Sequence, residues 1–201
     1  SSKMKLSEVG KRLNSQNVNN QKLPPLIMIT DSVKIPNPLK AAEKLPRGSG
    51  IIIRDYELTE RETLALDLLA ISRRSQLKLL IAGNPELAIK IGASGLHLSE
   101  FRATESRKWR HRRRWLITVA AHSRTGLRCA STCGADAVLL SPVFRTTTHP
   151  DAHPLGIHKF NSLSIGVPIP IYALGGINAN NATRLLNTSA AGIAGIGTFS
   201  N

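Results

Sequence analysis

Short apolar runs alternate with longer segments of helical periodicity from Leu26 almost to the end of the chain, and this alternation restricts the folds available. Nearly every position in the runs is apolar, as expected for parallel strands that are covered on both faces. The predicted strands are residues 26–30, 50–54, 78–82, 95–98, 116–120, 137–140, 169–173 and 192–196. Eight such strands are the number that closes a parallel barrel. The pattern therefore predicts a single (β/α)8 TIM barrel of the α/β class.

Helical segments are predicted between these strands. The clearest covers residues 59–75, where Thr59 caps the helix, Glu62 completes a capping box, and apolar side chains recur at helical spacing. Further helices are predicted at residues 38–45, 85–91, 124–132 and 178–186. Gly92 and Gly134 each end a helix just before a strand, a position that favours the left-handed conformation. An open doubly wound sheet has the same local pattern, so this pattern does not separate the two folds. The number of predicted strands favours the barrel.

The chain divides into two regions by composition. Residues 1–22 are polar and contain one weakly amphipathic stretch, so we expect an N-terminal arm or a loosely docked helix. Residues 23–201 form the predicted barrel domain. Cys129 and Cys133 lie four positions apart in a predicted helix, which favours reduced thiols. No apolar run approaches the ~18 residues of a membrane span, and no signal segment is evident, so we expect a cytoplasmic protein without membrane contact.

The charge is strongly positive. Lys and Arg number 27 against 13 acidic residues, a formal net charge of +14, which attracts phosphates and polyanions. Much of the excess lies in the segment Arg107 to Arg114, which is flanked and interrupted by Trp109 and Trp115. One interpretation is a nucleic-acid-binding patch. The interpretation that we favour is a solvated helix face whose tryptophans pack inward.

Two glycine-containing loops follow the last two predicted strands. Gly175 and Gly176 precede Asn178, which is placed to cap a helix, and the second loop contains Gly195, Ile196, Gly197 and Thr198. Glycines let backbone N–H groups approach an anion, and the loops after strands seven and eight form the phosphate site of many barrels. Together they predict phosphate binding; the alternative is a pair of tight turns without a ligand.

A long polar loop follows the sixth predicted strand, at residues 141–150. Such a loop is typical of an active-site flap. Its side chains Arg145, Thr146, Thr148 and His149 are candidates for contacting a phosphorylated substrate.

Two histidines lie in or next to strands. His122 directly follows the fifth predicted strand, where a side chain projects into a barrel mouth, so it is our candidate catalytic residue for proton transfer. A capping or supporting role beside Ser123 is the equal alternative. His97 alternates with apolar residues, and we expect a structural role in the core.

Several segments resemble the thiamine phosphate synthase and thiazole tautomerase family in the same order along the chain. The resemblance covers roughly residues 26–198 and rests on Leu26 to Asp31, Gly95 to Leu98, Ala121 to Ser123, Gly134 to Asp136, Ser141 to Phe144, His149-Pro150, Pro154 to Gly156 and Gly175 to Ile177. It implies a barrel that binds a thiazole phosphate on the two glycine loops. Synthases of the family join that compound to hydroxymethylpyrimidine diphosphate with loss of pyrophosphate, aided by Mg²⁺.

The resemblance fails at the diphosphate and metal half of the site. Arg54 is kept as a substrate-binding candidate, but the family's flanking pattern and metal carboxylates are replaced here by Ile52, Tyr56, Gly83 and Arg102. The family's Ser before the His-Ser pair is Ala120, and its flap Lys is His149. Glycine has no side chain and arginine is a cation, so neither is a Mg²⁺ ligand. No metal ligands are therefore predicted, and no cofactor is assigned.

Three hypotheses follow. The first is a thiamine-biosynthesis protein that binds thiazole phosphate and resembles thiamine phosphate synthase, with a degraded metal site. The second is the family's thiazole tautomerase, which needs no Mg²⁺ and would use His122. The third belongs to another class: a non-catalytic barrel that binds a phosphorylated ligand or RNA through Arg107 to Arg114. A homodimer is compatible with all three.

Overall fold

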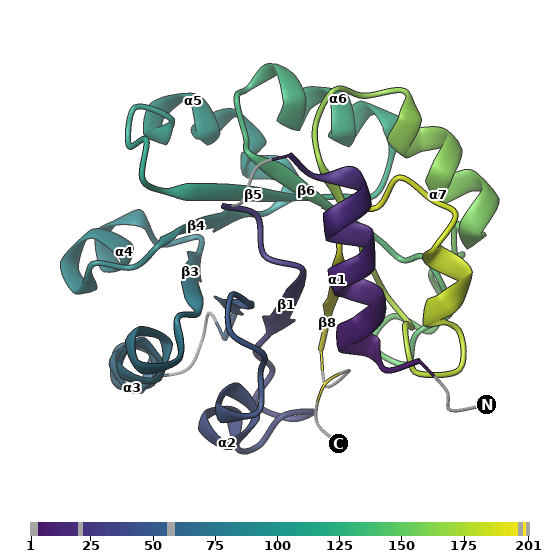
Figure 1. The fold of residues 1–201 in the computed structure, drawn as a ribbon. Helices are drawn as coiled ribbons and strands as arrows, with labels where there is room; N and C mark the ends of the chain where they lie inside the picture. The colour runs from purple at the N-terminus through teal and green to yellow at the C-terminus, as the bar shows by residue number, and fades with distance from the viewer. Residues whose placement is uncertain (1–3, 20–21, 56–58, 197–198, 200–201) are drawn as a thin grey trace.

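The computed structural model describes residues 4–19, 22–55, 59–196 and 199. Within them, eight parallel strands pair in chain order, and β1 pairs with both β2 and β8, which closes the barrel (Figure 1). The strands are β1 (Leu26–Ile29), β2 (Gly50–Ile53), β3 (Lys78–Ala82), β4 (Gly95–Leu98), β5 (Leu116–Ala121), β6 (Ala137–Leu140), β7 (Ile171–Leu174) and β8 (Ile193–Gly195). Closure confirms the TIM barrel and excludes the open doubly wound sheet.

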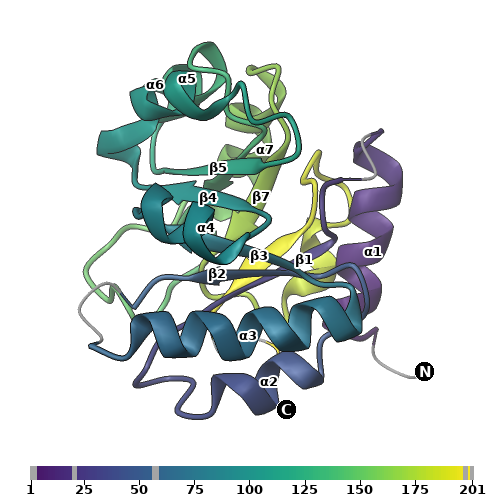
Figure 2. The same cartoon turned by 90° about the vertical axis from the view of Figure 1, so that its left-hand side faces the viewer.

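Helices surround the barrel on the outside. They are α1 (Leu6–Asn17), α2 (Pro38–Glu43), α3 (Arg61–Ser75), α4 (Pro85–Ile91), the 3₁₀ helix η1 (Glu100–Glu105), α5 (Ser106–Trp109), α6 (Arg124–Thr132), α7 (Gly156–Ile165) and the 3₁₀ helix η2 (Ala182–Leu185). Figure 2 shows α2 and α3 side by side along one side of the barrel, and these two helices also pack on each other.

Successive side chains of each strand point alternately into the barrel and toward the helices. In β2, Ile52 belongs to the cluster that fills the barrel interior, whereas Ile51 and Ile53 pack under the helices. All three side chains are fully buried. This two-sided burial explains why the strands are continuous apolar runs.

Most predicted strands are confirmed to within one or two residues. The largest shift is in β7, which begins at Ile171 instead of residue 169. Pro168 and Pro170 explain it, because proline has no N–H to donate to a ladder. Pro170 instead contributes its carbonyl, which accepts the N–H of Val138. The predicted αL glycines are also confirmed, with φ of 72° at Gly92 and 82° at Gly134.

The helix predicted at residues 59–75 is confirmed as α3, but its predicted capping box is wrong. Helix α3 begins at Arg61 after Glu60, and no side chain makes a cap hydrogen bond there, so Thr59 and Glu62 do not form a capping box. Glu62 instead pairs with Lys90 of α4 at 2.8 Å. The Glu62 side chain therefore reaches the next helix instead of the start of its own.

The helix predicted at residues 178–186 is also wrong. Only the 3₁₀ helix η2 (Ala182–Leu185) forms there. The Asn178 side chain accepts the backbone N–H groups of Asn180 and Asn181, which makes a compact turn instead of a helix start. Conversely, the ten-residue helix α7 after the flap was not predicted.

The N-terminal segment forms helix α1, which packs on β1 and η2. Val9 and Leu13 are fully buried on its inner face. Asn14 donates from Nδ2 to the carbonyls of Leu23 and Ala191, and Asn17 donates to two further carbonyls near β8. Amide side chains thus satisfy backbone groups between the helix and the barrel.

None of the helices in the described part of the chain is long and apolar enough to cross a membrane.

Candidate active site at the barrel mouth

The carboxyl ends of the strands bring several predicted residues to one end of the barrel. Ile29, Ile52 and Leu139 point into the interior, so the side chains two positions further along emerge at the mouth. These are Asp31, Arg54 and Ser141, and by the same alternation His122 follows β5. These four positions bring a carboxylate, a guanidinium, a hydroxyl and an imidazole to the mouth.

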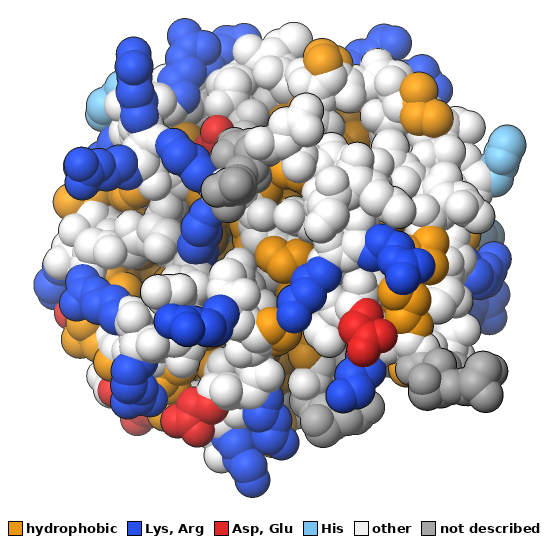
Figure 3. Space-filling view, viewed as in Figure 1, with side chains coloured by type: hydrophobic (Ala, Val, Ile, Leu, Met, Phe, Trp, Pro, Cys, Tyr) orange, Lys and Arg blue, Asp and Glu red, His pale blue; other side chains and the backbone are white. Residues whose placement is uncertain are grey.

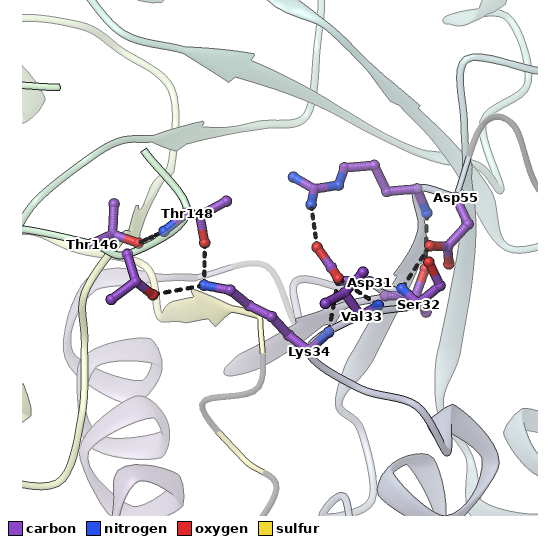
Figure 4. Close-up of polar contacts among 10 residues, drawn as sticks. Asp31, Ser32, Val33, Lys34, Asp55, Thr146 and Thr148 are labelled. Atoms are coloured by element: carbon purple, nitrogen blue, oxygen red, sulfur yellow. Dashed lines mark hydrogen bonds and ion pairs between the residues drawn. The ribbon is translucent and has the colours of Figure 1, made fainter. Parts of the chain in front are cut away.

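Asp31 and Arg54 form an ion pair at the mouth (Figure 4). Arg54 Nη2 lies 3.2 Å from Asp31 Oδ2, and Asp31 Oδ1 accepts the N–H groups of Val33 and Lys34, each at 2.9 Å. The hydrogen bond from Lys34 is the main cause that holds the pKa of Asp31 below its ordinary value, against the opposing effect of desolvation. Asp31 is therefore an ionised carboxylate that orients Arg54, the predicted substrate-binding cation.

Lys34 crosses from the loop after β1 to the flap after β6. Its Nζ donates to Thr147 Oγ1 at 3.0 Å and to the Thr148 hydroxyl (Figure 4). Sequence reasoning missed Lys34 because a lysine in a polar loop gives no signal of its partner 113 positions away. The contact ties the flap to the opposite side of the mouth.

The flap is also bonded to the end of β7. The Val143 N–H donates to the Leu174 carbonyl at 2.9 Å, and the Phe144 N–H donates to the Gly175 carbonyl at 3.0 Å. Beyond this anchor, Thr146 and Thr148 are half-buried, whereas Arg145 and His149 are exposed. The structure therefore places Thr148 with Lys34, while the contacts of Arg145 and His149 with a substrate stay a prediction.

Gly175 and Gly176 have φ of 108° and 66° and lie directly against the flap. A Cβ on Gly175 would be 2.8 Å from Pro142 Cα, and a Cβ on Gly176 would overlap the Arg145 carbonyl oxygen. Close packing with the flap thus accounts for both glycines. Their role in phosphate binding stays a prediction, and the helix N-terminus expected to assist it is absent from the described residues around Asn178.

The second predicted phosphate loop is only partly described. Gly195 is the last residue of β8 and pairs with Met28 of β1, and Ile196 follows it. Gly197 and Thr198 lie outside the described residues. Because β7 and β8 are neighbours, Gly176 and Ile196 lie at the same end of the barrel.

His122 is exposed at the mouth and is held on two sides. Its backbone N–H donates to Glu100 Oε2 at 2.6 Å, and its Nδ1 lies 3.1 Å from the Ser141 carbonyl and 3.2 Å from the Ser141 hydroxyl. In the Nδ1–H tautomer the ring donates to the Ser141 carbonyl, and in the Nε2–H tautomer Nδ1 accepts from the Ser141 hydroxyl. The Nδ1–H tautomer leaves Nε2 unprotonated, which is the form of a general base.

The alternative role considered for His122, capping of a helix, is filled by the neighbouring residue Ser123. Ser123 is the N-cap of α6, and its hydroxyl accepts the Gly126 N–H at 3.2 Å. Glu100 was not predicted as a site residue, because its role depends on the approach of the η1 segment to the end of β5.

His97 lies inside the barrel below the mouth, as expected for a core residue. It is buried, and its Nδ1 is 2.8 Å from the Thr118 hydroxyl on the neighbouring strand. Burial, with a smaller effect from the Arg54 charge, lowers the pKa of His97 to about 4. The ring is therefore neutral under ordinary conditions.

Similarity to known proteins identifies the family of this chain. The family model described as thiamine monophosphate synthase matches residues 26–199. The chain belongs to this family. Among its relatives is the "Putative thiamine-phosphate synthase 2" of Aquifex aeolicus, 36% identical over 182 residues that make up 88% of this chain and 98% of the relative. The thiamine-phosphate synthase of Lysinibacillus sphaericus is 32% identical over 84% of this chain and 83% of its own.

Solved structures agree on the fold. The thiamine phosphate pyrophosphorylase from Pyrococcus furiosus superposes with a TM-score of 0.73, covering 88% of this chain and 86% of that protein. Its sequence identity of 24% makes it evidence for the shared barrel alone.

The Mg²⁺ associated with this thiamine-biosynthesis family can be tested against the residues at the ends of β3 and β4. Asn84 Oδ1 accepts the Leu87 N–H at 2.9 Å as the cap of α4, and the Gly83 carbonyl accepts Arg102 Nη1 at 2.8 Å. Arg102 in turn pairs with Glu105. Among the described residues, no three His, Cys, Asp or Glu side chains gather as a metal site. Mg²⁺ requires several oxygen ligands. The guanidinium of Arg102 is a cation, and the amide oxygen of Asn84 already accepts a backbone hydrogen bond, so these residues do not fit the metal.

Proposed function

We propose that this family member acts on a thiazole phosphate in thiamine biosynthesis and that its own step is a metal-independent proton transfer on the thiazole ring by His122. The observation that supports this best is the contact of His122 Nδ1 with the Ser141 carbonyl at 3.1 Å. In the tautomer that donates from Nδ1 to this carbonyl, Nε2 is the base, at the mouth of the barrel where family members bind their substrates.

In the proposed step, Nε2 accepts a proton from one position of the ring system and returns it to another. The proton is conserved, so neither a co-reactant nor a redox partner is needed. While the proton is on the imidazole, the ring is a cation, and the Ser141 carbonyl stabilises it through Nδ1–H. Glu100 holds the backbone of His122 and adds a negative charge on the same side.

The phosphate group would bind at the neighbouring ends of β7 and β8. Backbone N–H groups of the Gly175–Gly176 loop and of residues 195–198 are the proposed donors, as the family resemblance implies. Arg54 and Lys34 add positive charge across the mouth, since Lys34 already reaches the flap. Arg145, Thr146, Thr148 and His149 stay proposed substrate contacts from the flap.

Coupling of the thiazole phosphate to hydroxymethylpyrimidine diphosphate is the second candidate. The observation that favours it is the 36% identity with the Aquifex aeolicus relative over nearly all of that protein, whose name is that of a synthase. Arg54 and Arg102 would then hold the diphosphate as charge-assisted donors in place of a metal.

One assay separates the two candidates. Exchange of the thiazole ring proton with deuterated solvent is followed by NMR for the wild type, for His122→Gln, and for His158→Gln as a control on the exposed face of α7. A second tube adds hydroxymethylpyrimidine diphosphate, with and without EDTA. Exchange that survives EDTA and is lost only in His122→Gln supports the proton-transfer function. Thiamine phosphate formed despite EDTA supports the second candidate. If neither activity is detected, both candidates are overturned.

A further inference from the structure

A cavity of about 670 Å³ lies at the opposite end of the barrel from His122. Its walls include Lys78 and Leu116, which begin β3 and β5, and Ser94 and Asp136, which directly precede β4 and β6. These positions are amino ends of strands, whereas the candidate active site is built at their carboxyl ends. The cavity is therefore separate from the mouth, and the proposed function does not use it.

The lining of this cavity is strongly cationic. Its cationic residues are Lys22, Lys78, Arg112, Arg113 and Arg114, and Asp136 is the acidic residue among the described lining. Asp136 Oδ2 accepts the Ile117 N–H at 2.7 Å, so this carboxylate is already engaged by the backbone. Within the described part of the chain, the ion pairs include neither Lys78 nor the three arginines. The cavity thus has positive charge in excess.

Lys78 is directed to the base of the barrel by strand alternation. Leu80 and Ala82, two and four positions later, belong to the interior cluster, so Lys78 shares their side of β3. Its ammonium group donates to the Lys22 carbonyl. Partial burial, followed by the positive charge of Lys22, lowers the pKa of Lys78. A bound anion would offset both effects.

Arg112 gives the cavity a fixed guanidinium group. Its guanidinium carbon lies 4.8 Å from the centre of the Trp115 ring, and Trp115 packs on Trp109 with ring centres 5.6 Å apart. The Nε of Arg112 is buried and has no hydrogen-bond partner among the described residues.

The loop that presents these arginines is held by its own backbone. The Arg112 N–H donates to the Trp109 carbonyl at 3.0 Å, and the Trp115 N–H donates to the Arg112 carbonyl at 2.8 Å. Around it, Lys and Arg side chains greatly outnumber acidic ones on the face shown in Figure 3. Because the loop is already ordered, less conformational entropy is lost when a ligand binds.

We propose that this cavity binds a small ligand that contains a di- or triphosphate group. Its volume lies within the usual range for small-molecule sites, and a single phosphate would neutralise only part of the lining charge. The structure also divides the basic segment identified in the sequence. Arg112, Arg113 and Arg114 line the cavity, whereas Arg107 and Arg110 do not.

Calorimetric titration with inorganic tripolyphosphate tests the proposal. We expect Arg112→Gln and Arg114→Gln to weaken binding roughly tenfold each, the loss typical of one charge-assisted hydrogen bond. Arg107→Gln is the matched control, because it removes the same charge from an exposed residue of the same segment outside the cavity. Arg54→Gln removes a cation of the mouth and reports any separate binding event there. We expect Arg107→Gln to bind within twofold of the wild type, and circular dichroism verifies that each variant is folded.

Three results would overturn the proposal. Absence of binding to the wild type excludes the site, and binding that is lost in Arg54→Gln but kept in Arg112→Gln and Arg114→Gln moves the phosphate to the barrel mouth. The third involves single-stranded RNA, titrated over a salt series with the same variants. If RNA displaces tripolyphosphate and Arg107→Gln weakens binding as much as Arg114→Gln, the surface is an extended nucleic-acid face instead of a cavity site.

Discussion

The carbonyl oxygen of Arg145 occupies the space in which Gly176 would place a Cβ atom. Gly176 also has a φ of 66°, and its carbonyl oxygen accepts a hydrogen bond from Asn181 Nδ2 at 2.8 Å. The loop after β7 and the flap after β6 therefore fit together through their backbones. The absence of a side chain at this position is a condition for the shape of the mouth.

Gly176→Ala should lower the free energy of unfolding by about 3 kcal/mol, because left-handed strain adds to a backbone overlap. Gly156→Ala is the matched control, with a φ of 73° and nothing within 4 Å of its Cβ position, and we expect a loss of about 1 kcal/mol. Urea unfolding of both variants measures the difference. Equal losses would mean that the flap moves aside at little cost.

Lys34→Met should loosen the flap. It removes the ammonium group that bonds the hydroxyls of Thr147 and Thr148, an exposed interaction whose loss should speed local opening severalfold. Amide hydrogen exchange of residues 146–149 measures it, with Lys40→Met on the exposed face of α2 as control. Unchanged exchange in Lys34→Met would show that the hydrogen bonds to β7 alone hold the flap.

The barrel could be predicted because its strands are local apolar patterns. Ile51, Ile52 and Ile53 are buried on opposite faces of β2, and that burial is visible as a continuous run in the sequence. Helix ends were harder, since they depend on partners far away. The predicted cap at Thr59 was wrong: α3 begins after Glu60, and Glu62 pairs with Lys90 in the next helix, a partner that no local pattern encodes.

The sequence predicted which residues lie at the site, but it did not predict which residues they contact. Arg54 and His122 were found because they directly follow strands, and the structure places both at the mouth. Their partners Asp31 and Ser141 lie 23 and 19 positions away. The cavity at the other end could not be foreseen, because Lys78 counts as an ordinary polar start of a strand until the barrel is closed.

Arg61 is a further residue whose role only the structure shows. Although it begins α3, it is buried, and its Nη2 donates to the Ile53 carbonyl at 3.1 Å and to the Ala82 carbonyl at 2.5 Å. It thereby joins the carboxyl ends of β2 and β3. Arg61→Met should cost about 2 to 3 kcal/mol, because two carbonyls lose their donor.

The control for Arg61 is Arg73→Met, which changes an exposed residue of the same helix and should stay within about 0.5 kcal/mol of the wild type. Chemical unfolding provides both values. If Arg61→Met is as stable as Arg73→Met, water replaces the guanidinium group and the strand ends need no clamp.

The depressed pKa of His97 predicts a loss of stability in mild acid. The folded protein binds a proton at His97 only near its pKa of about 4, whereas the unfolded chain binds one near the ordinary value of 6.5. As the pH falls from 6.5 toward 4, the unfolded state takes up more protons, so the free energy of unfolding decreases. His97 alone should account for a decrease of about 2 kcal/mol between pH 7.5 and pH 5.

Denaturant unfolding at the two pH values checks this in the wild type, in His97→Gln and in His111→Gln. The first variant replaces the buried imidazole beside Thr118, and the second changes an exposed histidine. We expect the acid-dependent component of about 2 kcal/mol to disappear only in His97→Gln. If it persists there, another group must take up the proton on unfolding. The interior histidine would then be accessible enough in the folded state to bind its proton at the ordinary pKa.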